Sequence, residues 1–186
     1  MGSYADDALF MSRNNIEYVE LISDDGKSKV MVIPAWQGRV MTTSAAGDEG
    51  DSYGWINYSF IKKRQIDLQF NPVGGEERFW LGPEGGVFSL YFRQGEKQIY
   101  KNWKVPPVLD IEAFKIQSQS KNCICLTKEG CLTNACGTTF YLNIKRTISL
   151  LDINEFAASF NLEFPKDIKA VAYKSDNQIT NIGNES

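Results

Sequence analysis

The chain has 186 residues, a formal net charge of −3, no histidine and a high content of aromatic residues. Its length is that of one domain, or slightly more, and is sufficient to bury a sizeable core. No basic stripe that would bind nucleic acid is visible, and the apolar runs are too short to span a membrane. The lack of histidine excludes the Ser-His-Asp and Cys-His catalytic arrangements and removes the commonest metal ligand.

The N-terminus lacks a secretory signal, because Met1 to Asp7 contains neither a basic region nor an apolar one. The chain as written therefore favours the cytoplasm. Its first three residues, Met-Gly-Ser, are also compatible with a cloning remnant that replaces a removed leader. The protein would then be periplasmic or secreted, so the sequence leaves the compartment open.

The first predicted element is a short helix from Ser3 to Arg13. Asp6 and Asp7 lie near its start and Arg13 at its end, which suits the helix dipole. No later segment has sustained helical periodicity. We therefore expect a helical tail over residues 1–15 and a single β domain over residues 16–186.

Short segments with strand character follow the helix and are separated by turns. They are Ile16–Ile22, Lys29–Pro34, Arg39–Thr43, Trp55–Ile61 (a strand or a short helix), a hairpin of Val87–Phe92 with Gln98–Tyr100, the extended Trp103–Leu109, Phe114–Gln119, Cys123–Lys128, Cys131–Asn134, Thr139–Leu151 and Lys169–Lys174. Lys29–Pro34 is apolar on both faces, so we expect it to be a central strand. This spacing predicts a mainly β fold, an antiparallel β-sandwich.

Thr139–Leu151 alternates most clearly between apolar and polar residues. Arg146 interrupts its apolar face, where a charge must be paired or must reach past the sheet edge. One interpretation is a guanidinium that joins two elements through a carboxylate. The other is a contact with an anion or a sugar.

The four cysteines do not have the Cys-x2-Cys spacing of zinc knuckles; they are Cys123, Cys125, Cys131 and Cys136. Free thiols are the preferred interpretation, and a disulfide or a metal site are the alternatives. We expect no cofactor and no metal.

The stretch from Asn71 to Gly86 concentrates glycine, proline, charged residues and one tryptophan. Its glycine pairs permit turns that a side chain would forbid. We expect a strand between them, and alternate residues of a strand share a face. One face then carries Glu76, Arg78 and Trp80, and the other carries Glu77, Phe79 and Leu81. The second face is the more apolar and should point to the core, which leaves the first for a ligand.

Three segments together resemble a known family: the turn Pro34–Val40, the stretch Asn71–Gly86 and the strand Phe140–Leu151. The chain is similar to the galactose mutarotase-like (aldose 1-epimerase-like) β-supersandwich proteins, and more closely to a bacterial branch of unknown function with a Gly-Gly-Glu-Glu-Arg-Phe-Trp-Leu-Gly-Pro-Glu-Gly-Gly motif. The resemblance implies a large antiparallel sandwich that binds carbohydrate on its concave face.

The resemblance covers nearly the whole chain but only about the N-terminal half of the family's fold. It implies further strands after the segment matched by Asn177–Asn181. A lone half-sandwich exposes strand edges and apolar surface. We therefore expect either a second copy of the chain or a C-terminal half to cover these edges.

A sugar offers apolar C–H faces to aromatic rings and hydroxyl groups to carboxylates, amides and arginine. The residues that we expect to bind it are Trp36, Arg39, Asn71, Glu76, Arg78, Trp80 and Glu84. The structural alternatives are a core position for each tryptophan and a purely structural Arg–carboxylate clamp.

Mutarotation needs an acid and a base at the anomeric centre. The resemblance implies a histidine acid, which this chain lacks, and a glutamate base in the C-terminal half. We therefore expect carbohydrate binding without epimerase activity. The alternatives are an epimerase or glycoside hydrolase that uses Glu or Tyr, and a protein-interaction module or homodimer that docks through an exposed sheet.

Overall fold

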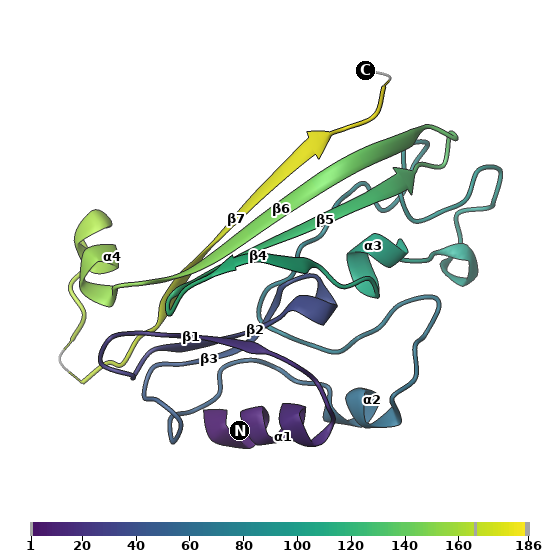
Figure 1. Cartoon of the computed structure of the whole chain (residues 1–186). Helices are drawn as coiled ribbons and strands as arrows, with labels where there is room; N and C mark the ends of the chain where they lie inside the picture. The colour runs from purple at the N-terminus through teal and green to yellow at the C-terminus, as the bar shows by residue number, and fades with distance from the viewer. Residues whose placement is uncertain (1, 166, 185–186) are drawn as a thin grey trace.

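The computed structural model describes residues 2–165 and 167–184 and contains two antiparallel sheets with a short N-terminal helix (Figure 1). This confirms the predicted mainly β fold with its sandwich-like arrangement. The elements in chain order are α1 (Tyr4–Arg13), β1 (Val19–Ile22), β2 (Lys29–Ile33), the 3-10 turn η1 (Pro34–Trp36), β3 (Arg39–Ser44), α2 (Tyr58–Lys63), the 3-10 turn η2 (Tyr100–Asn102), α3 (Pro107–Asp110), β4 (Lys115–Gln119), β5 (Cys123–Thr133), β6 (Thr139–Leu151), α4 (Ile153–Ser159) and β7 (Ala172–Asn181).

The two sheets have simple antiparallel orders. The smaller runs β1-β2-β3, and the larger runs β4-β5-β6-β7. The long β5–β6 hairpin pairs Ile124 with Ile148 and Leu126 with Arg146. β7 then pairs along β6, with Asn177 opposite Arg146. Within each sheet, strands that follow one another in the chain are therefore neighbours, as short connections favour.

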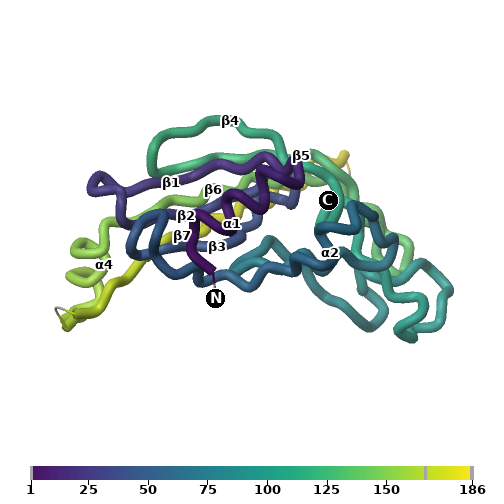
Figure 2. The backbone as a smooth tube through the Cα atoms, turned by 90° about the horizontal axis from the view of Figure 1, so that it is seen from below, coloured from purple at the N-terminus to yellow at the C-terminus, as the bar shows by residue number. Residues whose placement is uncertain are grey.

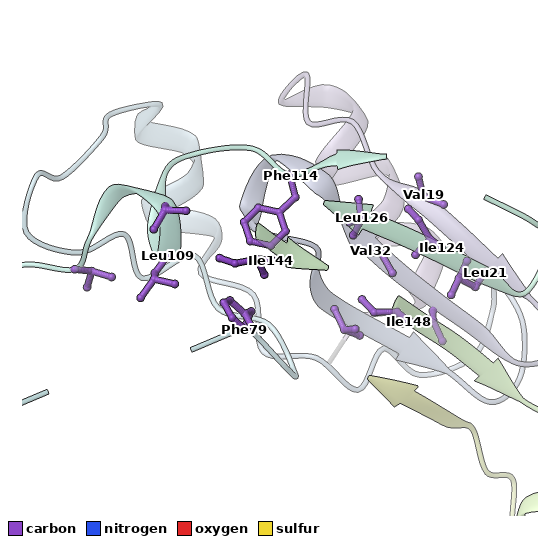
Figure 3. Packing of buried hydrophobic residues seen from close by; sticks show 14 of the residues in the cluster. Val19, Leu21, Val32, Phe79, Leu109, Phe114, Ile124, Leu126, Ile144 and Ile148 are labelled. Atoms are coloured by element: carbon purple, nitrogen blue, oxygen red, sulfur yellow. The ribbon is translucent and has the colours of Figure 1, made fainter. Parts of the chain in front are cut away.

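The main core lies between the two sheets (Figure 3). Val32 of the smaller sheet and Ile124, Ile144 and Ile148 of the larger one are completely buried there. Phe79 from the loop before β4 extends the core at one end. Burial of these side chains contributes about 1.5–3 kcal/mol each to folding.

Helix α1 covers the other face of the smaller sheet. Met31 and Met41 pack there against Tyr4 and Met11 of the helix, and all four are fully buried. Every residue of β2 is buried, which confirms that Lys29–Ile33 is a central strand. The molecule therefore has three layers: the helix, the smaller sheet and the larger sheet.

Local sequence fixes α1 in place. The Ser3 hydroxyl accepts a hydrogen bond from the Asp6 N–H at 3.2 Å, and the Asp6 carboxylate accepts one from the Ser3 N–H at 3.0 Å. This reciprocal capping box satisfies two otherwise free donors. The buried Asp7 accepts hydrogen bonds from the hydroxyls of Ser52 and Tyr58, which ties the helix to the chain after β3.

The structure confirms that Arg146 joins several elements through a carboxylate. Its fully buried guanidinium pairs with Glu77, and its Nη1 donates to Ser175 at 2.9 Å and to Asn177 at 2.7 Å. Its Nε donates to the Gly38 carbonyl at 3.1 Å. One side chain thus connects β6 with β7, with the turn before β3 and with the loop that holds Glu77.

Several predicted strands were wrong. Val87–Phe92 and Gln98–Tyr100 do not form a hairpin, because this segment makes local turns such as Ser89 N–H to the Gly86 carbonyl at 3.1 Å. The end of Trp103–Leu109 belongs to helix α3. Trp103 itself keeps an extended backbone, as predicted, and is not part of a strand. Trp55–Ile61 is expected to be a strand or a short helix, and the short helix α2 with Asn57 as its cap confirms the helical alternative.

Other predicted boundaries differ from those of the structure. Cys123–Lys128 and Cys131–Asn134 merge into the single strand β5, since β6 pairs along its whole length. The last strand starts at Ala172 and is longer than predicted, and α4 was missed although Asp152 caps it. All four cysteines are free thiols; Cys125 is buried, and Cys131 and Cys136 are exposed.

Candidate functional site

The Asn71–Gly86 stretch is a loop beside β3, the edge strand of the smaller sheet. The strand predicted over Glu76–Leu81 is reduced to one bridge, in which the Val40 N–H donates to the Glu77 carbonyl at 3.0 Å. Gly74 has a φ of +96°, and a Cβ there would lie 2.2 Å from the Trp55 carbonyl oxygen. Only glycine fits this close to the Trp55 carbonyl. Gly74 therefore allows the loop to run beside β3.

A buried carboxylate, that of Asp110, gathers two of the predicted residues. Its Oδ2 accepts hydrogen bonds from the Asn71 backbone N–H at 2.9 Å and from the Asn71 Nδ2 at 2.7 Å. Its Oδ1 lies 3.4 Å from Arg78 Nη2, which also donates to the Leu109 carbonyl at 2.6 Å. The sequence analysis did not identify Asp110, because its neighbouring residues do not indicate that this carboxylate is buried.

An aromatic column leads from Arg78 to the surface. The guanidinium carbon lies 4.1 Å from the centre of the Trp80 ring, and that ring lies 5.2 Å from Tyr91. Tyr91 stacks on Trp103 at 5.5 Å and 6°, and Trp103 stacks on Tyr100 at 6.3 Å and 12°. Tyr100 ends the column with 77% of its surface exposed. The column therefore presents a flat aromatic face to solvent.

An open pocket of about 540 Å³ lies at the outer end of the column. Its lining residues are Glu84, Gly85, Phe92, Gln98, Ile99, Tyr100 and Trp103. The Trp80 indole N–H donates to Glu84 Oε1 at 2.8 Å, which orients the carboxylate. We refer to this site as the Glu84 pocket.

Side-chain hydrogen bonds join the loops that form the Glu84 pocket. Gln98 accepts from the Gly86 N–H and donates to the Gly86 carbonyl, both at 2.7 Å. The buried Ser89 hydroxyl donates to the Glu84 carbonyl at 2.8 Å. Gln69 donates to the Tyr100 carbonyl at 2.6 Å. These bonds hold both walls of the pocket although no regular strand supports them.

Trp36 and Asn71 lie in a different pocket, of about 290 Å³. Its wall also contains Phe60, Val73 and Asp110. Asp110 therefore belongs to this second pocket and, through Arg78, also holds the inner end of the aromatic column. Trp36 does not line the Glu84 pocket.

Arg39 is buried beneath the Gly74–Gly75 turn, with 4% of its surface exposed. Its Nη1 donates to the Gly74 carbonyl at 2.5 Å, while Nε and Nη2 have no partner among the described residues. Burial, with repulsion from Arg78 as a smaller cause, lowers the pKa of Arg39 to about 9. Burial also lowers the pKa of Arg78, and the Asp110 carboxylate opposes this shift.

Glu76 is bound to β3 rather than to the aromatic column. Its Oε1 accepts from the Thr43 N–H at 2.7 Å and from the Thr43 hydroxyl at 2.9 Å. Burial raises the pKa of Glu76, and these hydrogen bonds oppose the rise. The structure thus connects Asn71, Arg78, Trp80 and Glu84 through shared contacts, and it places Glu76, Arg39 and Trp36 elsewhere.

The described ranges contain no group of three or more His, Cys, Asp or Glu side chains that could hold a metal ion. None of the helices in the part of the chain that the structure describes has the length and apolarity of a membrane span.

Comparison with known proteins identifies a family. A family model with the description "Family of unknown function (DUF6786)" matches residues 2–186, and the chain therefore belongs to this family. No curated protein and no solved structure is significantly similar to the chain.

Proposed function

We propose that this member of the DUF6786 family binds carbohydrate in the Glu84 pocket and does not catalyse epimerisation. The observation that carries the proposal is the combination of an exposed aromatic surface with an oriented carboxylate in one open pocket. Tyr100, Trp103 and Phe92 supply the aromatic surface, and Glu84 supplies the carboxylate.

This combination matches both parts of a sugar ring. Aromatic rings are flat and apolar, and they remove the C–H face of a sugar from water. The Glu84 carboxylate can accept from two neighbouring hydroxyls, and the Gln98 amide offers a donor and an acceptor. A hexose lying on Tyr100 would therefore have polar partners at its edge.

The walls of the pocket are fixed before any ligand arrives. Glu84 is bonded through its side chain to Trp80 and through its carbonyl to Ser89. Binding then costs less side-chain entropy than it would in a mobile loop, where each ordered side chain costs about 0.5–1.5 kcal/mol. This preorganisation favours a binding role for the exposed aromatics.

We further propose that the chain is related to the galactose mutarotase-like proteins. Two antiparallel sheets and the glycine-rich loop beside β3 support this relationship. The complete lack of histidine argues against their acid–base chemistry. Glycoside hydrolysis needs a pair of carboxylates, and Glu84 is the one carboxylate among the lining residues of its pocket.

Tryptophan fluorescence tests the proposal directly. A panel of neutral mono- and oligosaccharides should change the emission of the wild type, because Trp103 lines the pocket and Trp80 holds Glu84. Trp80→Ala should abolish the response, since it removes the indole that orients the carboxylate. Trp36→Phe is the matched control, and it should respond like the wild type because Trp36 lies in the other pocket. A response that is lost in Trp36→Phe and kept in Trp80→Ala would contradict the proposal.

Enzyme activity is the first alternative function, with Glu or Tyr as the acid. Polarimetry on freshly dissolved glucose or galactose distinguishes it from binding. We expect the rotation to relax at the rate seen in buffer alone. A faster relaxation that depends on protein concentration would favour an epimerase.

Association through an exposed sheet is the second alternative, and the edge strand β7 favours it. Ile179 of β7 and Phe140 of β6 are 45% and 38% exposed, and Ile182 lies just beyond β7. Light scattering tests this idea. A dimer that is disrupted by Ile179→Lys would support it, whereas a monomer at all concentrations would count against it.

A further inference from the structure

We infer that the Glu84 pocket selects amino sugars, whose protonated amine is bound by the Glu84 carboxylate and the surrounding aromatic rings. This inference rests on the proposed carbohydrate-binding function and narrows its ligand class. The charge of the lining, the position of the carboxylate and the nature of the aromatic surface all favour a cationic sugar.

The lining of the pocket is acidic. Of its seven residues, Glu84 is charged, three are aromatic and none is basic. A site for a neutral sugar needs no net charge, and a site for an acidic sugar needs a cation in its wall. A single carboxylate without a basic partner in the lining instead favours a cationic ligand.

The carboxylate of Glu84 is held but not neutralised. Its Oε1 accepts from the uncharged indole N–H of Trp80 at 2.8 Å. The hydrogen bond fixes the orientation of the group and supplies no positive counter-charge. Arg78 lies on the Trp80 ring, yet its guanidinium pairs with Asp110 and the Leu109 carbonyl. Arg78 therefore has a carboxylate other than Glu84 as its partner.

The aromatic side chains can also attract a cation. An ammonium within about 6 Å of a ring centre gains roughly 0.5–2 kcal/mol from the ring quadrupole. Tyr100, Trp103 and Phe92 surround the same open space as Glu84. The aromatic faces would contact both the C–H side of the sugar ring and its ammonium group. The Glu84 carboxylate would accept hydrogen bonds from the same ammonium group.

Four exposed basic residues adjoin lining residues in the chain without lining the pocket themselves. They are Arg93, Lys97, Lys101 and Lys104. Exposed charges are largely screened beyond about 8 Å at physiological salt. The repulsion that these basic residues exert on a cation is therefore strongest at low ionic strength, and Glu84 is the charged residue in the lining itself.

Calorimetric titration with four related sugars tests the inference. The ligands are glucosamine, N-acetylglucosamine, glucose and glucuronate, measured at about pH 6, where the free amine is protonated. Glucosamine should bind about tenfold more tightly than glucose or N-acetylglucosamine, and glucuronate should bind most weakly. Glu84→Gln keeps the shape and the acceptor for Trp80, and it should abolish the preference for glucosamine.

The outcomes separate this inference from the proposed function. Equal affinities for glucosamine, glucose and N-acetylglucosamine would overturn the inference and leave carbohydrate binding intact. Tightest binding of glucuronate would also overturn it. If none of the four sugars binds and the wider glycan panel gives no response, the proposed function fails with it. A second measurement avoids reliance on the variant: raising the pH to deprotonate the amine should weaken glucosamine binding and leave glucose binding unchanged.

Discussion

At the scale of single residues, buried polar side chains decide how the loops attach to the sheets. Arg146 is fully buried and Glu77 is its carboxylate partner, with 28% of the Glu77 side chain exposed. The alternation of Thr139–Leu151 was sufficient to predict that Arg146 needs a partner. It could not identify Glu77, because the two residues are far apart in sequence and the strand predicted around Glu77 is a loop.

Glu77→Gln should destabilise the protein substantially. The change leaves the buried Arg146 guanidinium without its counter-charge, and such a loss costs about 3 kcal/mol. Urea unfolding followed by circular dichroism measures the effect as a lower midpoint. Glu163→Gln removes an exposed carboxylate and should change the free energy of unfolding by less than about 0.5 kcal/mol. Equal effects of the two substitutions would contradict the role given to Glu77.

Tyr58 should make stability depend on alkaline pH. Tyr58 is half-exposed, but partial desolvation of its hydroxyl, followed by the hydrogen bond to Asp7, raises its pKa from 10.0 to about 12. Because the folded-state pKa is the higher one, this contribution is complete below about pH 10 and is lost as the pH rises toward about 12. Urea titrations across this pH range should show that the free energy of unfolding falls less steeply with pH in Tyr58→Phe than in the wild type. Tyr53→Phe removes an exposed hydroxyl as a control, and identical profiles for all three proteins would refute the assignment.

At the scale of elements, strands were predictable where side chains alternate and loops were not. β6 has the bounds expected for Thr139–Leu151, and β2 is buried on both faces as its composition indicates. The aromatic column from Trp80 to Tyr100 could not be predicted, because it depends on stacking between loops without periodicity. The sequence identified Trp80 and Glu84 as ligand candidates, but it gave no sign that Asp110 organises their neighbours.

The Gly74–Gly75 turn should tolerate no side chain at its first position. Gly74→Ala combines a φ of +96° with a Cβ that would lie 2.2 Å from the Trp55 carbonyl. We expect a loss of about 2 kcal/mol or more in the free energy of unfolding. Gly85 is the matched control in the same loop, since its nearest neighbour would lie at 3.7 Å. Thermal denaturation should show a clearly lower melting temperature for Gly74→Ala and little change for Gly85→Ala. A larger effect of Gly85→Ala would be incompatible with the turn described above.

At the scale of the whole molecule, the loops that form the Glu84 pocket lie together at one end. Figures 1 and 2 show the loops between α2 and α3 at the end opposite α4, next to the turn of the β5–β6 hairpin. The Ala135 N–H donates to the Ser89 carbonyl at 2.7 Å and links that turn to the loops. The fold class followed from the spacing of short strands. The division into three layers did not, because it depends on how α1 and the two sheets pack.

Nuclear magnetic resonance of the indole N–H groups tests the central claim most directly. The chain has four tryptophans, and Trp80 alone among them donates its indole N–H to Glu84. A bound sugar in the Glu84 pocket should shift the indole resonances of Trp80 and Trp103 in a saturable way and leave those of Trp36 and Trp55 in place. Saturable shifts confined to Trp36 or Trp55, or no shift with any sugar of a broad panel, would contradict carbohydrate binding at this site.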